Sequence, residues 1–338
     1  MTVLRFLFKS VAILLLLVVF VASAAWGAMA VHYSDLGRTA LGTALAGLFV
    51  LLSLAVLVGL FSRRWRWHAI AGYALAFACL ITWWSGISPS NDRQWKPEVA
   101  RLPLVSIDGE QFTFRNIRNF AYRTEADFVP AFYEKTFDLG KLESVDVIAS
   151  YWGSAAIAHM FVSFNFGVDD HLDISIERRD EMGEAYSTVK GLFKQYELFY
   201  VVADERDVIR LRTNVRRDPP EDVYIYRLKG PIENARRLFL EYVKKIDSLA
   251  THPEFYNTVA TNCTGNIWLH SKVNPGSVPY SWKILLSGYV PEYLYEQGKL
   301  DTSMPFPELQ RRSRVNAAAQ AADQAVDFSR RIRARLPE

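Results

Sequence analysis

Three uncharged, apolar stretches dominate the first part of the chain. They run over residues 11–31, 39–61 and 69–88. Each is close to the ~20 residues that a helix needs to cross the ~30 Å of hydrocarbon in a bilayer. The pattern therefore predicts a membrane domain over residues 1–88 with three spanning helices.

Basic residues near the ends of these stretches predict their orientation. Two basic residues precede the first stretch and three arginines separate the second from the third, whereas the remaining loop holds only Arg38, balanced by Asp35. Short cytoplasmic loops carry the excess of lysine and arginine in membrane proteins. We therefore expect the amino terminus in the cytoplasm and everything after Ser88 on the outer side.

A cleaved signal peptide over residues 1–24 is a second interpretation of the first stretch. Its basic start and the run Ala22-Ser23-Ala24 are typical of such a segment. We favour an uncleaved helix because the apolar stretch continues to Val31, which is longer than most signal cores. Both interpretations leave the rest of the chain on the same side of the membrane.

Residues 89–310 combine strand and helix patterns and predict one α+β domain. Strands are predicted from period-two alternation and from runs of β-branched and aromatic residues. These segments are 105–120, 157–177, 197–203 and 223–228. Apolar residues at helical spacing predict an amphipathic helix over 231–249, and we expect residues 125–143 to be helical or irregular.

The last segment, residues 311–338, is a basic tail with a helical composition. It contains three consecutive alanines at 317–319 and a cluster of arginines from Arg330 onward. Because its apolar face is small, we expect a frayed, solvated helix. The alternative is a helix that lies along anionic lipid headgroups.

Charge and motif content limit the partners of the outer domain. Acidic and basic residues after Ser88 nearly balance, whereas a nucleic-acid partner would need a dense basic face. The chain has no Cys-x-x-Cys, His-Glu-x-x-His or calcium-loop pattern. It also lacks a glycine-rich phosphate loop and a Gly-x-Ser-x-Gly elbow. We expect neither a metal nor another cofactor.

Cys263 is the candidate nucleophile, because it is the one cysteine outside the predicted membrane helices. It lies in a polar run in which Thr261 or Asn262 can cap a short helix that begins at the thiol. A helix amino terminus stabilises a thiolate and offers N–H groups to an oxyanion. Asn262 and Thr264 are therefore candidates for positioning the thiol or the oxyanion, and a buried, inert thiol is the alternative.

His159 is the candidate base. It lies within the apolar strand pattern 157–164, where a titratable side chain has no structural reason to be. The other histidines of the outer domain are expected at ordinary exposed positions, 171, 252 and 270. A satisfied buried histidine remains the alternative for His159.

Glu177 is the candidate third member, which would orient the imidazole. In a hairpin that folds about residues 167–170, position 159 lies opposite residues 177–179. The alternative for Glu177 is an ordinary salt bridge with a neighbouring arginine.

A second polar cluster spans residues 204–212. Such runs of charge are typical of solvated turns. The functional alternative has Arg206 and Arg210 in contact with a phosphate or a lipid headgroup.

Several motifs in this order resemble the Lnb-type family, which is known by its periplasmic domain and whose namesake is a bacterial lipoprotein N-acyltransferase. The motifs are residues 114–120, 158–164, 174–179, 204–209 and 253–264. The resemblance covers roughly residues 90–310. The histidine-before-cysteine order is also similar to the circularly permuted branch of the NlpC-type, papain-like fold, which has an antiparallel sheet.

This resemblance implies a membrane-anchored thiol acyltransferase in a bacterial inner membrane, with its carboxy-terminal domain in the periplasm. Cys263 matches the nucleophile, His159 the base and Glu177 a further motif position. The implied acyl donor is a phospholipid, and the implied acceptor is an amine, the amino terminus of a lipoprotein. A peptidase or amidase acting on cell-wall peptides would use the same pair in a polar, water-filled cleft, and a non-catalytic binding module would merely bury the thiol.

Overall fold

The computed structural model describes residues 2–185 and 187–337 and divides them into two compact units. One unit holds the chain up to Pro89 together with residues 187–195. The other holds Ser90–Ala185 and the chain from Tyr196 onward. Helices and strands are mixed, so the predicted mixed class is confirmed.

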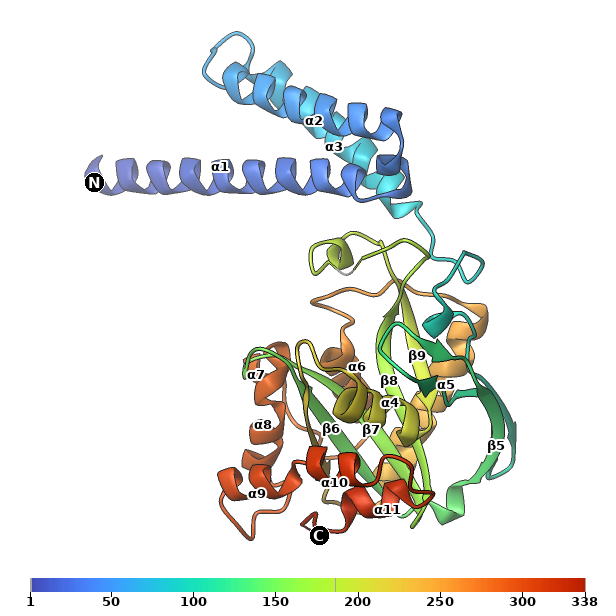
Figure 1. Cartoon of the computed structure of the whole chain (residues 1–338). Coiled ribbons are helices and arrows are strands. Elements are labelled where there is room, and N and C mark those ends of the chain that lie inside the picture. Colours follow the sequence, from blue (N-terminus) through green and yellow to red (C-terminus); the bar gives the residue numbers. More distant parts are fainter. Residues whose placement is uncertain (1, 186, 338) are drawn as a thin grey trace. The chain divides into compact units, whose positions relative to one another are not determined.

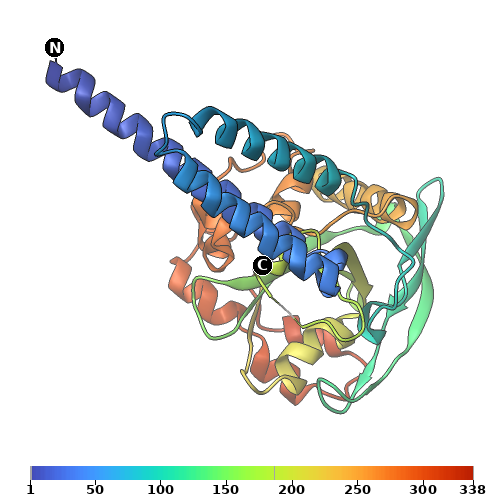
Figure 2. The ribbon, with the colours of Figure 1, turned by 90° about the horizontal axis from the view of Figure 1, so that it is seen from above.

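Three apolar helices form most of the first unit: α1 (Thr2–His32), α2 (Ala40–Gly59) and α3 (Arg66–Ser85). Each is long and apolar enough to cross a membrane, as the sequence predicts. Large apolar side chains of these helices are exposed on several sides, which is typical of helices that lipid surrounds. The first turns of α1 project beyond α2 and α3 (Figure 2).

Residues 187–195 belong to the helical unit, although the chain places them between two strands of the other unit. The ring of Phe193 packs edge-on against Trp84 at a centroid distance of 6.2 Å. Lys194 Nζ donates to the carbonyl oxygens of Trp84 and Ile87, at 2.9 and 3.0 Å. A cation at a helix carboxyl end satisfies carbonyls that the helix leaves open. This segment therefore caps α3.

A largely antiparallel sheet forms the centre of the second unit (Figure 1). Its strands are β1 (Leu104–Asp108), β2 (Gln111–Arg118), β5 (Phe132–Asp138), β6 (Ser144–Tyr151), β7 (Ala158–Gly167), β8 (Asp170–Arg179), β9 (Glu197–Ala203) and β10 (Asp222–Arg227). They follow the order β1-β2-β9-β8-β7-β6-β10, and β5 pairs with β2. Two short strands, β3 (Ala121–Tyr122) and β4 (Phe128–Val129), form a separate small sheet.

The predicted hairpins and strands are present, but the expectation for residues 125–143 is wrong. The β1–β2 turn contains Gly109 with φ of +58°, a conformation that glycine adopts at low cost. Residues 125–143 contain β4 and β5 rather than a helix. Because β5 fully buries only Phe137, its alternation of apolar and polar residues is too weak to read from the sequence.

The two faces of the sheet build separate cores. Even-numbered residues of β7 and β8 pack against α5 (Ile232–Thr251) and α6 (Cys263–Ser271). Phe164 and Phe239 meet there at a centroid distance of 5.2 Å. On the other face, Phe161 shares a core with α4 (Glu205–Arg210), α10 (Asn316–Ala321) and α11 (Phe328–Arg333) (Figure 1).

The carboxy-terminal residues belong to this second core, so the expectation of a solvated tail is wrong. α10 and α11 bury side chains in this core, whereas α9 (Phe306–Ser313) buries Leu309 in the other one. Ile332 is only 2% exposed. The apolar positions are split among these short helices. No single helix therefore shows the wide apolar face that would have predicted burial.

Arg333 ties α11 to β6 and to α4 through two buried carboxylates. Its Nε donates to Asp146 Oδ2 at 2.9 Å, and its Nη1 donates to Glu205 Oε2 at 2.7 Å. Asp146 and Glu205 are almost completely buried. Arg333 thus neutralises charge that would be costly to leave unpaired inside the protein.

We expect Arg333→Ala to lower the free energy of unfolding of the second unit by about 3–5 kcal/mol, because a broken buried ion pair leaves its partners uncompensated. Denaturant titration of the full chain, followed by tryptophan fluorescence, measures this change. Arg331→Ala is the matched control, since Arg331 pairs with Asp327 at the surface of the same helix. Equal shifts for the two variants would contradict this role of Arg333.

Candidate active site

Helix α6 begins at Cys263, as the sequence predicts. Asn262 is its N-cap: Oδ1 accepts the N–H of Gly265 at 2.7 Å, and Nδ2 donates to the carbonyl oxygen of Thr258 at 2.9 Å. The cap places the thiol in the first helical turn, at the positive end of the helix dipole. Asn262 therefore positions the helix that carries the thiol.

The far end of α6 is anchored by His270, which the sequence analysis wrongly placed at an exposed position. Its Nε2 lies 2.7 Å from the Tyr200 hydroxyl, and its ring packs against Tyr242 at a centroid distance of 4.5 Å. Burial, assisted by Lys245, lowers the pKa of His270 to about 4. The ring is therefore neutral near pH 7, and it shares a hydrogen bond with the Tyr200 hydroxyl. His171, also expected to be exposed, is buried as well.

His159 lies where β7 and β8 separate. The ladder between these strands reaches only from the hairpin turn to the pair Val162 and Ile174. Beyond that pair β7 stays on β6 and β8 stays on β9, and the two strand pairs diverge (Figure 1). His159 is an odd-numbered residue on the face opposite α6, and the opening lets its ring reach Cys263.

A serine stands between His159 and the predicted third member. The Ser175 hydroxyl lies 2.7 Å from His159 Nε2 and donates to Glu177 Oε1 at 2.8 Å. Glu177 Oε1 is itself 3.6 Å from the same ring nitrogen. Because the single hydroxyl proton goes to Glu177, the serine oxygen accepts from Nε2–H. Nδ1 is then the ring nitrogen left to take a proton from the thiol.

Glu177 approaches His159, as the hairpin register predicts. It does not form the alternative ion pair with a neighbouring arginine. Its cation is Arg212, whose Nη2 lies 3.3 Å from Glu177 Oε1. Arg178 pairs with Asp180 instead, and Arg179 donates to backbone carbonyl oxygens. The sequence analysis missed both Ser175 and Arg212. Ser175 could have been found from the sequence, because it lies two residues before Glu177 on the same strand and therefore shares its face.

Arg212 is held rigidly beside the site. Its side chain is 5% exposed, its guanidinium lies over the ring of Phe161 at 5.1 Å, and its Nη1 donates to the carbonyl oxygen of Val208 at 2.8 Å. Burial opposes a charge on Glu177, yet the hydrogen bond and charge of His159 and the charge of Arg212 hold the pKa of Glu177 well below its usual range. Glu177 therefore remains a carboxylate that supports a protonated His159.

Cys263 and His159 favour each other's charged forms. Burial opposes the thiolate, but hydrogen bonding and charge from His159, with smaller contributions from Met160 N–H and Thr264, lower the pKa of Cys263 to about 7. Burial likewise opposes the imidazolium, but hydrogen bonds with Cys263 and Glu177 raise the pKa of His159 to about 8. Thr264 Oγ1 lies 3.6 Å from Sγ. Near neutral pH the pair therefore favours a thiolate beside an imidazolium.

The cluster at residues 204–212 is not the solvated turn that we expected. Asp204 caps α4 through the N–H of Arg206, and Asp207 is fully buried. Arg206 donates to the carbonyl oxygen of Ala325. Arg210 Nε lies 2.7 Å from Asp323 Oδ1. Arg206 and Arg210, the two candidate headgroup residues, therefore bind the carboxy-terminal segment rather than Cys263 or His159.

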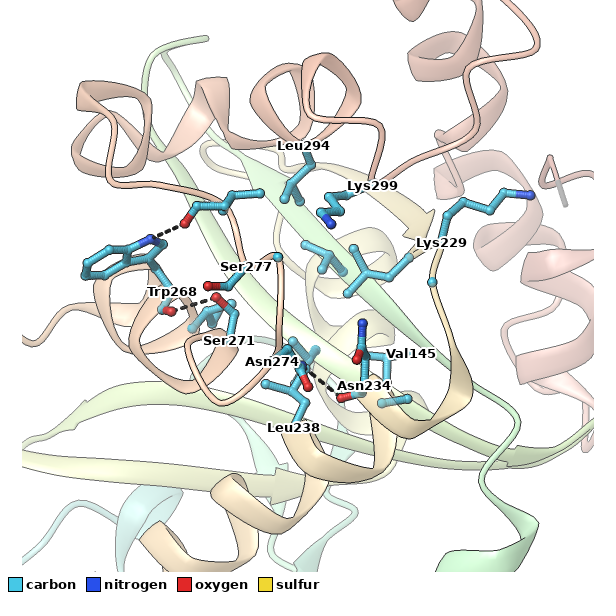
Figure 3. A pocket seen from close by; sticks show the side chains of 18 of the residues that line it. Val145, Lys229, Asn234, Leu238, Trp268, Ser271, Asn274, Ser277, Leu294 and Lys299 are labelled. Carbon is cyan, nitrogen blue, oxygen red and sulfur yellow. Dashed lines mark hydrogen bonds between the residues drawn. The ribbon is translucent and has the colours of Figure 1, made fainter.

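An apolar cavity of about 210 Å³ is lined by residues next to the candidate pair, although neither Cys263 nor His159 lines it. Met160, which follows His159, and Thr264, which follows Cys263, line its buried end. Figure 3 shows the cavity wall, to which β6 contributes Val145 and α5 contributes Leu238. Among the residues that the structure describes, no group of three or more His, Cys, Asp or Glu side chains could hold a metal ion.

We expect alkylation of Cys263 by iodoacetamide to rise with pH and to reach half its maximum near pH 7, because the thiol loses its proton around that value. In His159→Ala the half-maximum should move up to ~8.5 or above, the range of an unassisted thiol. Rates measured from pH 5 to pH 10 by intact-protein mass spectrometry test both statements. Superimposable profiles would show that His159 does not activate the thiol.

Ser175→Ala should also raise the pH of half-maximal alkylation, since His159 loses the acceptor that fixes its Nε2 proton. One lost hydrogen bond to a charged group is worth about 1.5–3 kcal/mol, so the rate at pH 7 should fall roughly tenfold to hundredfold. Ser175→Thr, which keeps the hydroxyl, should restore the profile. Ser163→Ala is the control, because this buried serine on the same face bonds to Glu205 instead; an equal effect there would indicate a general loss of structure.

The comparison with known families covers the segment that carries the candidate residues. Residues 129–288 match the family described as the Lnb N-terminal periplasmic domain. The matched segment contains His159, Ser175, Glu177 and Cys263. No curated protein and no solved structure matches the chain. With its three apolar helices, the chain is a membrane protein that carries a periplasmic domain, and over residues 129–288 that domain is of the Lnb N-terminal periplasmic type.

Proposed function

We propose that this protein is a membrane-anchored thiol acyltransferase of the bacterial inner membrane. The observation that carries the proposal is that Thr264, whose Oγ1 lies 3.6 Å from Cys263 Sγ, lines the buried end of an apolar cavity. A thiolate is a strong nucleophile, and an apolar wall beside it suits a hydrocarbon chain. The family resemblance supports the same reaction class, and with it a circularly permuted papain-like fold.

In the first half of the reaction, Cys263 would take an acyl group from a phospholipid. His159 removes the thiol proton, and the thiolate forms a bond to the ester carbonyl carbon while the carbonyl π electrons move to oxygen. When the tetrahedral intermediate collapses, the bond to the glycerol oxygen breaks. The imidazolium then gives its proton to that oxygen, which leaves a lysophospholipid and a thioester on Cys263.

In the second half, an amine would take the acyl group from the thioester. The amine nitrogen attacks the carbonyl carbon, and His159 accepts the proton that the nitrogen loses. The carbon–sulfur bond breaks and restores the thiolate, so that the product is an amide. The amino terminus of a lipoprotein is the acceptor that the family resemblance favours.

Both steps develop negative charge on the carbonyl oxygen, and the start of α6 is oriented to stabilise it. The side chain of Asn262 accepts the N–H of Gly265. The N–H groups of Cys263 and Thr264 lie closer to the start of the helix than that of Gly265. N–H groups in the first turn of a helix point out of its amino-terminal end, where they favour an anion. They would serve as the oxyanion hole, where one donor is typically worth ~10²–10³ in rate.

Two other functions use the same residues less well. A peptidase acting on cell-wall peptides needs hydrogen-bond partners for peptide groups, and the cavity wall beside the thiol is mostly apolar. A binding module without catalysis gives no reason for the ordered chain from Cys263 to Glu177, because buried polar groups are costly to arrange. We therefore favour acyl transfer.

The test is intact-protein mass spectrometry of the full chain in nanodiscs of diacyl phospholipid. We expect wild type to gain the mass of one fatty acyl group, which hydroxylamine removes because the bond is a thioester. Matched nanodiscs of diether phospholipid present the same headgroup without an ester and should give no adduct. Cys263→Ser and His159→Ala should also remain unmodified.

The negative outcomes differ in meaning. If iodoacetamide modifies Cys263 at neutral pH but no acyl adduct forms, the phospholipid is not the donor and peptide hydrolysis becomes the better hypothesis. If the thiol does not react with either reagent, the domain is a non-catalytic module.

A further inference from the structure

The cavity has a buried end and a surface end. Met160, Val162 and Thr264 line the buried end and are almost completely buried. Cys263 does not line the cavity itself, but its Sγ lies 3.6 Å from Thr264 Oγ1. At its other end the lining residues Gly230 and Pro275 are exposed. A ligand with one end at the thiol would therefore extend from the interior of the domain toward its surface.

We propose that this cavity binds the acyl chain of the Cys263 thioester and encloses roughly eight of its carbons. The inference rests on the proposed function, since it assigns a place to the chain that the thiol would carry. It adds a limit on the substrate, because the walls of this domain would set how many carbons of the chain are enclosed.

The wall chemistry favours hydrocarbon. β6 and β7 supply the floor, α5 and α6 supply two sides, and α8 (Val290–Glu296) supplies a third. Leucine, valine and isoleucine side chains predominate away from the surface end. A peptide in this space would leave N–H and C=O groups without partners, which is unfavourable, whereas methylene groups gain from leaving water.

The size of the cavity sets the number of carbons. An apolar cavity of ~150 Å³ is large enough for benzene, with its six carbons. In proportion, a cavity of about 210 Å³ holds roughly eight carbons of a chain. Atoms beyond that number would emerge at the surface end and gain little from further burial.

Several polar residues that line the cavity also hold its walls together. Asn274 Nδ2 donates to the carbonyl oxygen of Asn234 at 3.0 Å, and Asn274 Oδ1 accepts from Arg237 Nε at 2.9 Å. Trp268 Nε1 donates to the carbonyl oxygen of Val278 at 3.0 Å. Figure 3 shows the first and last of these contacts on neighbouring sides of the cavity. These bonds tie α6 and its following loop to α5, so the cavity should keep its dimensions and discriminate by length.

The experiment follows acylation of Cys263 by a series of p-nitrophenyl esters from acetyl to dodecanoyl. The full chain is held in diether nanodiscs, which contain no competing ester. For wild type, the second-order rate constant should rise roughly two- to fourfold per methylene up to octanoyl, as expected from burial of each methylene, and then level off. Released nitrophenolate and protein mass report the same event.

Ala235→Trp is the informative variant, because Ala235 lines the cavity on α5. It should lower the octanoyl rate more than tenfold and leave the acetyl rate within twofold, which also shows that the variant is folded. Leu240→Trp is the matched control on the same helix, since Leu240 is 40% exposed and does not line the cavity. A wild-type rate that does not depend on chain length, or an equal loss for acetyl and octanoyl in Ala235→Trp, would overturn the inference.

A binding measurement separates this inference from the proposed function. Cys263→Ser should bind a dansyl-labelled undecanoate, and Cys263→Ser combined with Ala235→Trp should bind it at least tenfold more weakly. Binding of the probe without acylation of wild type by any ester would refute acyl transfer and leave the chain-binding cavity standing. Acylation at equal rates for all chains, without binding of the probe, would refute the cavity and leave acyl transfer standing.

Discussion

The candidate site depends on one break in the sheet, where the ladder between β7 and β8 ends at Val162 and Ile174. Side chains of a strand alternate between its faces, so an unbroken ladder would separate the imidazole of His159 from the helix that carries Cys263. Beyond the break β7 keeps its bonds to β6, and β8 keeps its bonds to β9. The sheet therefore opens without leaving both edges of either strand unpaired, and the opening is what joins an odd-face base to an even-face nucleophile.

Behind His159 the domain pairs several buried charges with groups of opposite sign. Arg212 serves Glu177, and Arg333 serves Asp146 and Glu205. Buried ion pairs add little net stability because desolvation offsets the attraction. Here these pairs order the site. Because Glu177 stays ionised and Ser175 accepts one proton, His159 keeps a single tautomer and a single orientation. The same logic applies at the other end of the site, where Tyr200 and neutral His270 hold α6.

Local patterns predicted most of the candidate site, and long-range packing accounts for what they missed. Cys263 at a helix start follows from the polar residues before it, and the approach of Glu177 to His159 follows from counting along a hairpin. Arg212 follows α4 in a π-helical turn, Leu211–Val215, and nothing near it in the sequence shows that it faces Glu177. Phe328 and Ile332 lie on short helices whose burial depends on a sheet face more than 100 residues earlier in the chain. Such partners become visible only when the fold brings them together.

The combination of an ion pair with an apolar cavity also bears on which nucleophile completes the reaction. Water and an amine compete for a thioester, and hydrolysis wins where water reaches the carbonyl carbon freely. A chain that fills the cavity would displace water from one side of that carbon, and the amphipathic substrates of a membrane surface would occupy the other. His159 would then accept a proton from an amine in a site where little water competes. In the proposed acyl transfer the apolar wall would therefore do more than bind the donor chain, because it would also favour transfer over hydrolysis.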